Sequence, residues 1–131
     1  MKRRKNELVG RQLDVIEKTL STEVITLFIA DAERKSLREF TINYYRQECN
    51  DFRKFLVTND YSLIVNEVVR EQIDEFVDDL KKRPNLKPTM INPRLRALRT
   101  LFNFLEDCKY IFDNPMRKYP LLKDRKWVTY H

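Results

Sequence analysis

Two types of polar side chain recur along one stretch of the chain at a spacing suited to binding nucleic acid. Asn92, Arg96, Arg99 and Asn103 follow one another at steps of four, three and four residues, which places them on one face of an α-helix. Guanidinium forks bind phosphates and guanine edges, and carboxamides pair with adenine edges. The pattern therefore predicts contacts with DNA. The alternative, that these side chains only solvate the outer face of a core helix, stays open at this point.

The carboxylates and thiols of the chain lack the partners that catalysis or metal binding requires. Cys49 and Cys108 form no Cys-x-x-Cys motif and no Cys/His cluster, so we expect two small buried residues in a reducing cytosol. No histidine or nucleophile accompanies the acidic segment 66–82, and we interpret its carboxylates as a solvated helix face; they are Glu71, Asp74, Glu75, Asp78 and Asp79. We expect no catalytic residue, no metal and no cofactor.

Composition limits the class of protein further. The 131 residues suffice for one domain with its own core, and the formal net charge of +6 permits a polyanionic partner. No apolar run reaches the roughly 20 residues that span a bilayer, and no apolar segment follows the basic N-terminus as it would in a secretory signal. We expect a cytoplasmic protein without a membrane partner.

The elements that must position the polar stripe are helices. The chain has one glycine, and its apolar residues recur mostly at steps of three and four, which is typical of helix faces. We predict a compact all-α bundle of four to five helices, with helices over about 22–34, 42–57, 66–82 and 89–108. The helical domain would cover residues 20–115, between a basic N-terminal tail and helix lead-in (1–19) and a basic linker (116–131).

Polar residues ahead of the apolar stretches predict where the helices begin. We place the caps of three helices at Ser21 or Thr22, Thr41 and Thr89. Pro93 leaves two starts open for the last helix, at Thr89 or at Asn92, because proline is favoured only at the first helical position. The predicted core faces include Val24, Leu27, Phe28 and Ala32, then Tyr45, Cys49, Phe52 and Leu56, then Val69, Ile73, Phe76, Val77 and Leu80, and finally Ile91, Leu95, Leu98, Phe102 and Leu105.

Several short motifs occur in a defined order along these helices: Phe28, Thr41-x-x-Tyr44, Phe52-x-x-Phe55-Leu56, Ile73-x-x-Phe76, Ile91-Asn92, Leu98-Arg99-x-x-Phe102 and Asn114-Pro115. No single motif is specific. The ordered set resembles the N-terminal SAM-like core-binding domain of tyrosine recombinases, the phage and transposon integrases, over about residues 20–123. The resemblance implies a compact bundle that docks on one face of a DNA half-site and forms half of a clamp. A C-terminal catalytic domain closes the other half.

The resemblance also implies which residues face DNA. They lie near the start of the second helix and along the fourth: Lys35, Ser36, Arg38, Thr41, Asn43, Tyr44, Lys87, Thr89, Asn92, Arg94, Arg96 and Arg99. Asn92 and Arg96 are the candidates for base edges. The candidates for phosphates are Lys35, Arg38, Lys87 and Arg94. The expected partners are double-stranded DNA, the catalytic domain of the same longer protein, and neighbouring protomers on DNA.

Two features depart from the pattern of that family. Pro93 stands where the family usually has a polar residue, which bears on the contacts of the first helical turn. The catalytic arginines, lysine, histidines and tyrosine of the family are absent, because the single histidine is His131 and Tyr130 has no such residues near it in the sequence. We expect a non-enzymatic fragment of a longer integrase that alone binds DNA weakly, on the order of micromolar at low salt.

Two other functions stay open. An all-α protein–protein interaction module would use the acidic helix and the apolar tail, and its binding would not depend on salt. An enzyme acting on nucleic acid would need the histidine, nucleophile or metal ligands that the chain lacks. Arg99 also has its own alternative, which is a structural ion pair with the acidic helix.

Overall fold

The computed structural model describes residues 16–122, and its regular structure is helical. The α-helices are α2 (Thr22–Arg34), α3 (Glu39–Thr58), α4 (Arg70–Lys82) and α5 (Ile91–Asp107), with short 3₁₀ helices η2 (Val65–Glu67) and η3 (Pro88–Met90). Within residues 16–122 the only β pairing is one isolated bridge between Thr19 and Ile64. The prediction of an all-α bundle is confirmed. Residues 1–15 of the predicted basic tail (1–19) and residues 123–131 of the predicted linker (116–131) lie outside the described residues.

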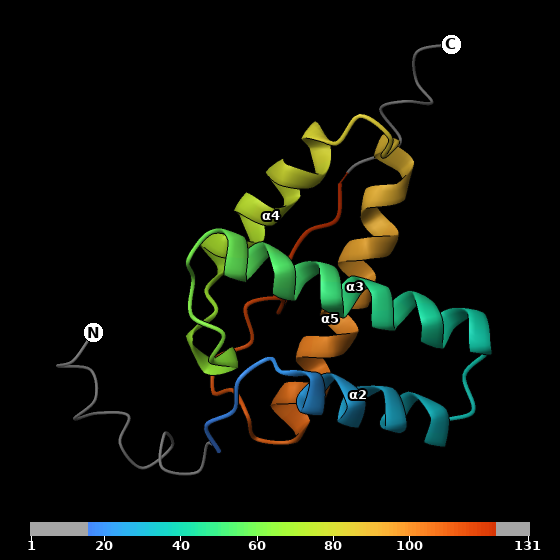
Figure 1. Ribbon diagram of the computed structural model, residues 1–131, viewed down its shortest axis with the longest axis vertical. Coiled ribbons are helices and arrows are strands. Elements are labelled where there is room, and N and C mark those ends of the chain that lie inside the picture. Colours follow the sequence, from blue (N-terminus) through green and yellow to red (C-terminus); the bar gives the residue numbers. More distant parts are fainter. Residues whose placement is uncertain (1–15, 123–131) are drawn as a thin grey trace, which may run out of the picture.

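Helix α5 is the element on which the others assemble. Figure 1 shows α2 and α3 lying roughly side by side, and α5 crosses behind α3. Helix α4 lies on the side of α3 that faces away from α2. Helix α3 packs on both α2 and α5, and α4 packs on α5. The chain that follows α5 runs back between α4 and α5 (Figure 1). As a result, the side chains of α5 meet neighbours on almost every side.

Four phenylalanines, one from each α-helix, form the centre of the core. Phe28, Phe52, Phe76 and Phe102 are each at most 1% exposed. The ring of Phe52 meets the rings of Phe76 and Phe102 edge-on, at centroid distances of 5.2 and 6.0 Å. Edge-to-face pairs of this kind contribute about 0.5–1.5 kcal/mol each beyond the area they bury. All four residues were predicted as core from their helical spacing.

Burial along α5 extends well beyond its predicted apolar stripe. Ala97 and Leu101 lie outside that stripe and are nevertheless buried, and the ring of Phe104 packs against Phe28 of α2. The exposed residues of the helix are Arg96, Asn103 and Asp107. They are spaced by seven and four residues and therefore form one narrow line along the helix. None of the helices within residues 16–122 has the length and apolarity that a membrane crossing requires.

The helix starts are partly as predicted. Ser21 caps α2, where its hydroxyl accepts a hydrogen bond from the Val24 N–H at 3.2 Å. The predicted cap at Thr41 is wrong, because α3 already begins at Glu39 with Arg38 as its N-cap. The start of α3 therefore lies two residues before Thr41, and no side-chain hydrogen bond caps it.

The start of α5 also differs from both predicted starts. The 3₁₀ helix η3 contains Thr89 and leads directly into α5 at Ile91, with Met90 as N-cap. Thr89 is therefore not the cap. Pro93 lies within the first turn, where a backbone N–H would have no helical partner, so the missing donor of proline costs little there.

Two shorter corrections concern segments next to helices. Residues 16–18 have no helical structure, although the helix lead-in predicted over residues 1–19 includes them. Their backbone instead pairs with other segments, with the Ile16 N–H donating to the Lys109 carbonyl at 2.7 Å. Val69 is 47% exposed rather than in the core, because α4 begins at Arg70 and Val68 takes the buried position before it.

Three helices end in the same way without using glycine. After α2, the N–H of Leu37 donates to the Ala32 carbonyl and the N–H of Ser36 donates to the Glu33 carbonyl, which is a Schellman motif. The residue at its left-handed position is Ser36, with φ of 60°. Asp60 after α3 and Lys109 after α5 occupy the equivalent positions, with φ of 61° and 64°. Only glycine adopts this conformation without steric cost.

Candidate nucleic-acid interface

Helix α5 divides the predicted DNA-facing residues between two sides of the domain. Successive residues of an α-helix are rotated by about 100°, so Arg94 and Arg96 point about 200° apart. Arg94 faces α3, where it contacts Glu48 and Asp51. Asn92 faces the opposite side, toward the chain that follows α5. The predicted set therefore does not form one continuous surface.

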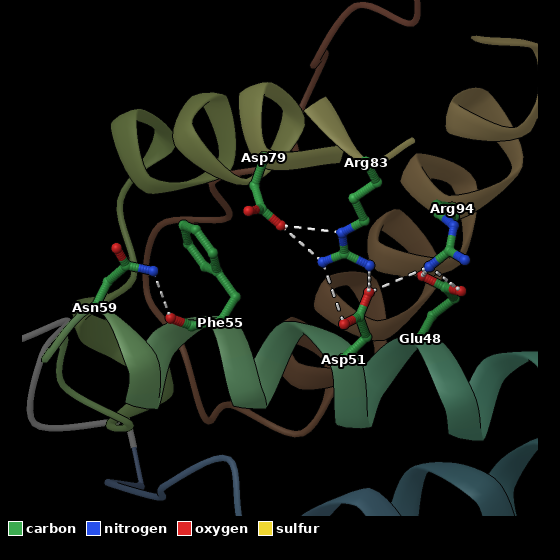
Figure 2. Close-up of polar contacts among 7 residues, drawn as sticks. All are labelled: Glu48, Asp51, Phe55, Asn59, Asp79, Arg83 and Arg94. Atoms are coloured by element: carbon green, nitrogen blue, oxygen red, sulfur yellow. Dashed lines mark hydrogen bonds and ion pairs between the residues drawn. The ribbon is translucent and has the colours of Figure 1, made fainter. Parts of the chain in front are cut away.

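On the α3 side, Arg94 belongs to a chain of charged contacts. One terminal nitrogen of Arg94 lies 2.8 Å from a carboxylate oxygen of Glu48 and 3.2 Å from one of Asp51. Arg83, at the end of α4, contacts Asp51 at 2.9 Å and Asp79 at 2.7 Å. Figure 2 shows these five side chains converging from α3, α4 and α5. We call them the ion-pair chain.

The ion-pair chain places a charged group in the protein interior. Glu48 is 2% exposed, and burial raises the pKa of its carboxyl group, while the neighbouring Arg94 opposes that rise. Tyr44 lies close enough to Glu48 and Arg94 for both charges to shift the pKa of its hydroxyl group. Its pKa is raised by burial first and by Glu48 second, and Arg94 lowers it. The structure thus brings together two predicted DNA-facing residues, Tyr44 and Arg94, around a carboxylate that the prediction missed.

The sequence position of Glu48 already indicated that its carboxylate would be buried. It directly precedes Cys49 and lies four residues before Phe52, both predicted to be core residues, so it falls at the edge of the buried face of α3. A carboxylate at such a position needs a cationic partner. The sequence cannot identify that partner, because Arg94 is 46 positions away.

On the opposite side of α5, the polar stripe binds the chain that follows the helix. The carboxamide of Asn92, a residue 7% exposed, donates to the Leu122 carbonyl at 2.9 Å and accepts from the Leu122 N–H at 2.7 Å. Arg99 donates to the Tyr119 carbonyl. Asn103 accepts from the Asn114 side chain at 3.1 Å. We call residues 114–122 the C-terminal segment; their contacts occupy three of the four stripe residues.

These contacts change the interpretation of two predicted residues. The hydrogen bonds to Leu122 use both ends of the Asn92 carboxamide, which leaves it unsuited to reading a base edge. The predicted alternative for Arg99, an ion pair with the acidic helix, is also not what the structure has, because its partner is a backbone carbonyl. The Nε of Arg99 is buried without a hydrogen-bond partner among the described residues. Arg96 is the stripe residue whose exposed guanidinium has no partner within residues 16–122.

The other predicted residues lie near the beginnings of α3 and α5. Lys35 forms an ion pair with Asp31 at 3.2 Å, and Ser36 occupies the left-handed position after α2. Asn43 is exposed and accepts from Arg46 at 2.9 Å. The remaining four are Arg38, Lys87 and Thr89, which are exposed, and Thr41, which is half-buried. In Figure 1 the beginnings of α3 and α5 both lie toward the right of the domain.

One comparison with known proteins, the match to a family model, agrees with this architecture. The family model for the phage integrase N-terminal SAM-like domain matches residues 25–109, well over half of the chain. No curated protein and no solved structure matches the chain. The matched region begins within α2 and ends just after α5, so it contains α3, α4 and α5 in full. The chain belongs to the family of phage integrase N-terminal SAM-like domains.

Proposed function

We propose that this chain is the DNA-binding, core-site-binding domain of a tyrosine recombinase and carries no catalytic residue of its own. Its family supports a core-binding role in general. The observation that supports a DNA contact is the exposure of Arg38 and Lys87, next to the starts of α3 and α5, without an ion-pair partner within residues 16–122. Strand exchange is assigned to a C-terminal catalytic domain of the same longer protein.

The proposed surface consists of the residues near the beginnings of α3 and α5: Arg38, Thr41, Asn43, Tyr44, Lys87 and Thr89. Arg38 and Lys87 would bind phosphates, because both are exposed cations. Arg38 is also the N-cap of α3, whose first N–H groups attract anions. Thr41, Asn43 and Tyr44 lie on α3 after Arg38, and their hydroxyl and carboxamide groups would offer hydrogen bonds to the groove. Lys35 and Ser36 would flank the surface at the turn before α3.

Arg94 has a positioning role in this proposal. If its guanidinium turned toward a phosphate, it would leave the buried carboxylate of Glu48 without its partner, which is strongly unfavourable. The ion-pair chain instead fixes α3 against α5. The spacing between the two helix starts, and therefore between Arg38 and Lys87, depends on that junction.

The test is a titration of a short labelled DNA duplex with the chain. Fluorescence anisotropy monitors binding, and the titration is repeated at a series of salt concentrations. Each lost phosphate contact reduces the slope of log affinity against log salt by about 1. We expect Arg38→Ala and Lys87→Ala each to weaken binding and to lower this slope. Lys54→Ala is the matched control, since it removes the same charge from an exposed position farther along α3.

Arg96→Ala tests which side of α5 contacts DNA. Unchanged affinity in this variant, with losses in Arg38→Ala and Lys87→Ala, supports the proposed surface. The reverse result would place the DNA on the side of the C-terminal segment and contradict the surface proposed here. A chain that binds no duplex at low salt, alone or with the catalytic domain added, would contradict the function itself.

One observation favours a second function, an interaction with another protein. Leu37, in the turn between α2 and α3, is 37% exposed, and Phe40, in the first turn of α3, is 79% exposed. Large apolar side chains exposed together are typical of protein contacts. Sedimentation of the chain should then show self-association that high salt does not weaken and that Phe40→Ser abolishes. A monomer at all concentrations would exclude a second copy of the chain as the partner.

A further inference from the structure

The C-terminal segment is attached to the helices at both ends and in the middle. At its beginning, the Asn114 side chain donates to Asn103 at 3.1 Å and to Glu106 at 2.9 Å. In the middle, the Tyr119 carbonyl accepts from Arg99. At its end, Leu122 makes both backbone hydrogen bonds to Asn92. Because the order of contacts along α5 is reversed relative to the segment, the two run antiparallel.

Helix α4 holds the same segment from the other side. Arg70 donates to the Arg117 carbonyl at 3.2 Å and lies over the Tyr119 ring, 4.8 Å from its centroid. The Tyr119 hydroxyl forms a hydrogen bond with Asp74. Figure 1 shows the segment running between α4 and α5. Side chains on two helices therefore bind three of its carbonyls, those of residues 117, 119 and 122.

The side chains of the segment make its register unique. Met116 is fully buried and Tyr119 is 7% exposed, so a shift by one residue would remove both from the core. Asn92 adds a backbone-like pair of hydrogen bonds at the far end, where Leu121 and Leu122 are only half-buried. Without Asn92, those last residues would keep only partial apolar packing.

We propose that residues 114–122 form a rigid strut, with Asn92 as the positioning residue that fixes its far end at Leu122. The position of Leu122 is then set by α5 and α4, and the segment does not move as a free tether. This inference rests on the contacts of the segment alone and does not depend on DNA binding.

The test measures the distance between two spin labels in the whole chain. Labels are attached through Lys54→Cys on α3 and Pro120→Cys at an exposed position within the segment, with Cys108→Ser removing the more accessible native thiol. We expect one narrow distance distribution. Asn92→Leu removes both hydrogen bonds to Leu122 and should cause loss of the narrow peak. Arg96→Leu is the matched control on the same helix and should leave the peak unchanged.

Two results would overturn the proposal: a broad distribution in the chain with Asn92 intact, or a narrow one in Asn92→Leu. If Asn92→Leu fails to fold by circular dichroism, amide exchange of the unsubstituted chain decides instead. The Leu122 amide should exchange at least about tenfold more slowly than its intrinsic rate, since Asn92 holds it closed. Exchange at the intrinsic rate would refute the strut. Neither readout involves DNA, so failure here leaves the proposed function untouched.

Discussion

Arg94 and Glu48 form an ion pair of 2.8 Å between α5 and α3, and the Glu48 side chain is only 2% exposed. A buried pair of this kind adds little net stability, because both charges lose their hydration. Removing one partner is much more costly, since the other charge stays buried alone. The contact therefore makes α3 and α5 dependent on each other at the point where both contribute predicted DNA-facing residues.

The first prediction concerns the two halves of this pair. Arg94→Met should lower the free energy of unfolding by about 3 kcal/mol, because it leaves the Glu48 carboxylate without its nearest cation. Glu48→Gln should cost less, since a neutral amide still accepts a hydrogen bond from Arg94. Urea denaturation followed by circular dichroism measures both. Arg96→Met is the control and should change stability by less than about 0.5 kcal/mol. Equal losses in Arg94→Met and Arg96→Met would contradict the pairing.

A second prediction follows from the direction of the Glu48 pKa. Burial raises this pKa above its ordinary value of 4.5 in the folded protein, so the folded state binds the proton more tightly than the unfolded chain. The contribution of Glu48 to stability is therefore full below pH 4.5 and is lost as pH rises through the folded pKa. In Glu48→Gln this loss of stability with rising pH is absent, because the amide side chain does not titrate. The stability of the variant relative to the unsubstituted protein should rise over this window.

Urea denaturation of Glu48→Gln and of the unsubstituted protein, at several pH values between about 4 and about 7, measures this difference. Glu71→Gln, at an exposed position on α4, provides the control. A difference between Glu48→Gln and the unsubstituted protein that stays constant with pH, or falls as pH rises, would show that the folded state does not raise this pKa.

A third prediction concerns the left-handed residues after the helices. Lys109 has φ of 64°, and its Cβ makes this conformation unfavourable by roughly 1 kcal/mol. Lys109→Gly should therefore raise the thermal midpoint, with a gain of up to about 1 kcal/mol. Lys35→Gly tests the opposite case, because Lys35 has φ of −85° and gains nothing from the freedom of glycine. It should be neutral or destabilising; stabilisation by both substitutions would point to a cause other than φ.

A fourth prediction separates the two thiols. Cys49 is 1% exposed, and burial raises the pKa of its thiol to about 12, so it should not react with a thiol reagent near neutral pH. Cys108 is half-buried after α5 and should react in the folded protein. Titration should count one reactive thiol in the native state and two in denaturant. Fast labelling of native Cys108→Ser would show that the core around Cys49 opens.

The elements that could be predicted are those with a strong periodic signal. The apolar spacing of α2 and of the core face of α3 places Phe28 and Phe52 correctly, and Ser21 has the residue type that a helix start requires. The helix starts at Thr41 and Thr89 could not be located in this way. Each depends on a neighbouring turn, whose geometry comes from contacts between residues rather than from the type of one residue.

The predicted interface shows the same limit. A stripe of Asn92, Arg96 and Arg99 on one helix face is visible in the sequence, but the same donors that suit phosphates and bases also suit backbone carbonyls. The sequence contains no signal for which of these partners is present. Glu48 could have been suspected from its place beside Cys49, yet its pairing with Arg94 needed the helix crossing.

The sequence by itself determined the all-α class, most of the core and the position of the polar stripe, because helical periodicity is local and is repeated over many residues. Only the tertiary structure decided what the stripe contacts. The direction of the chain after Asn114 brings Leu122 back to Asn92, and the crossing of α3 over α5 brings Glu48 to Arg94. Both pairings join positions at least 30 residues apart, and no local pattern encodes the path between them.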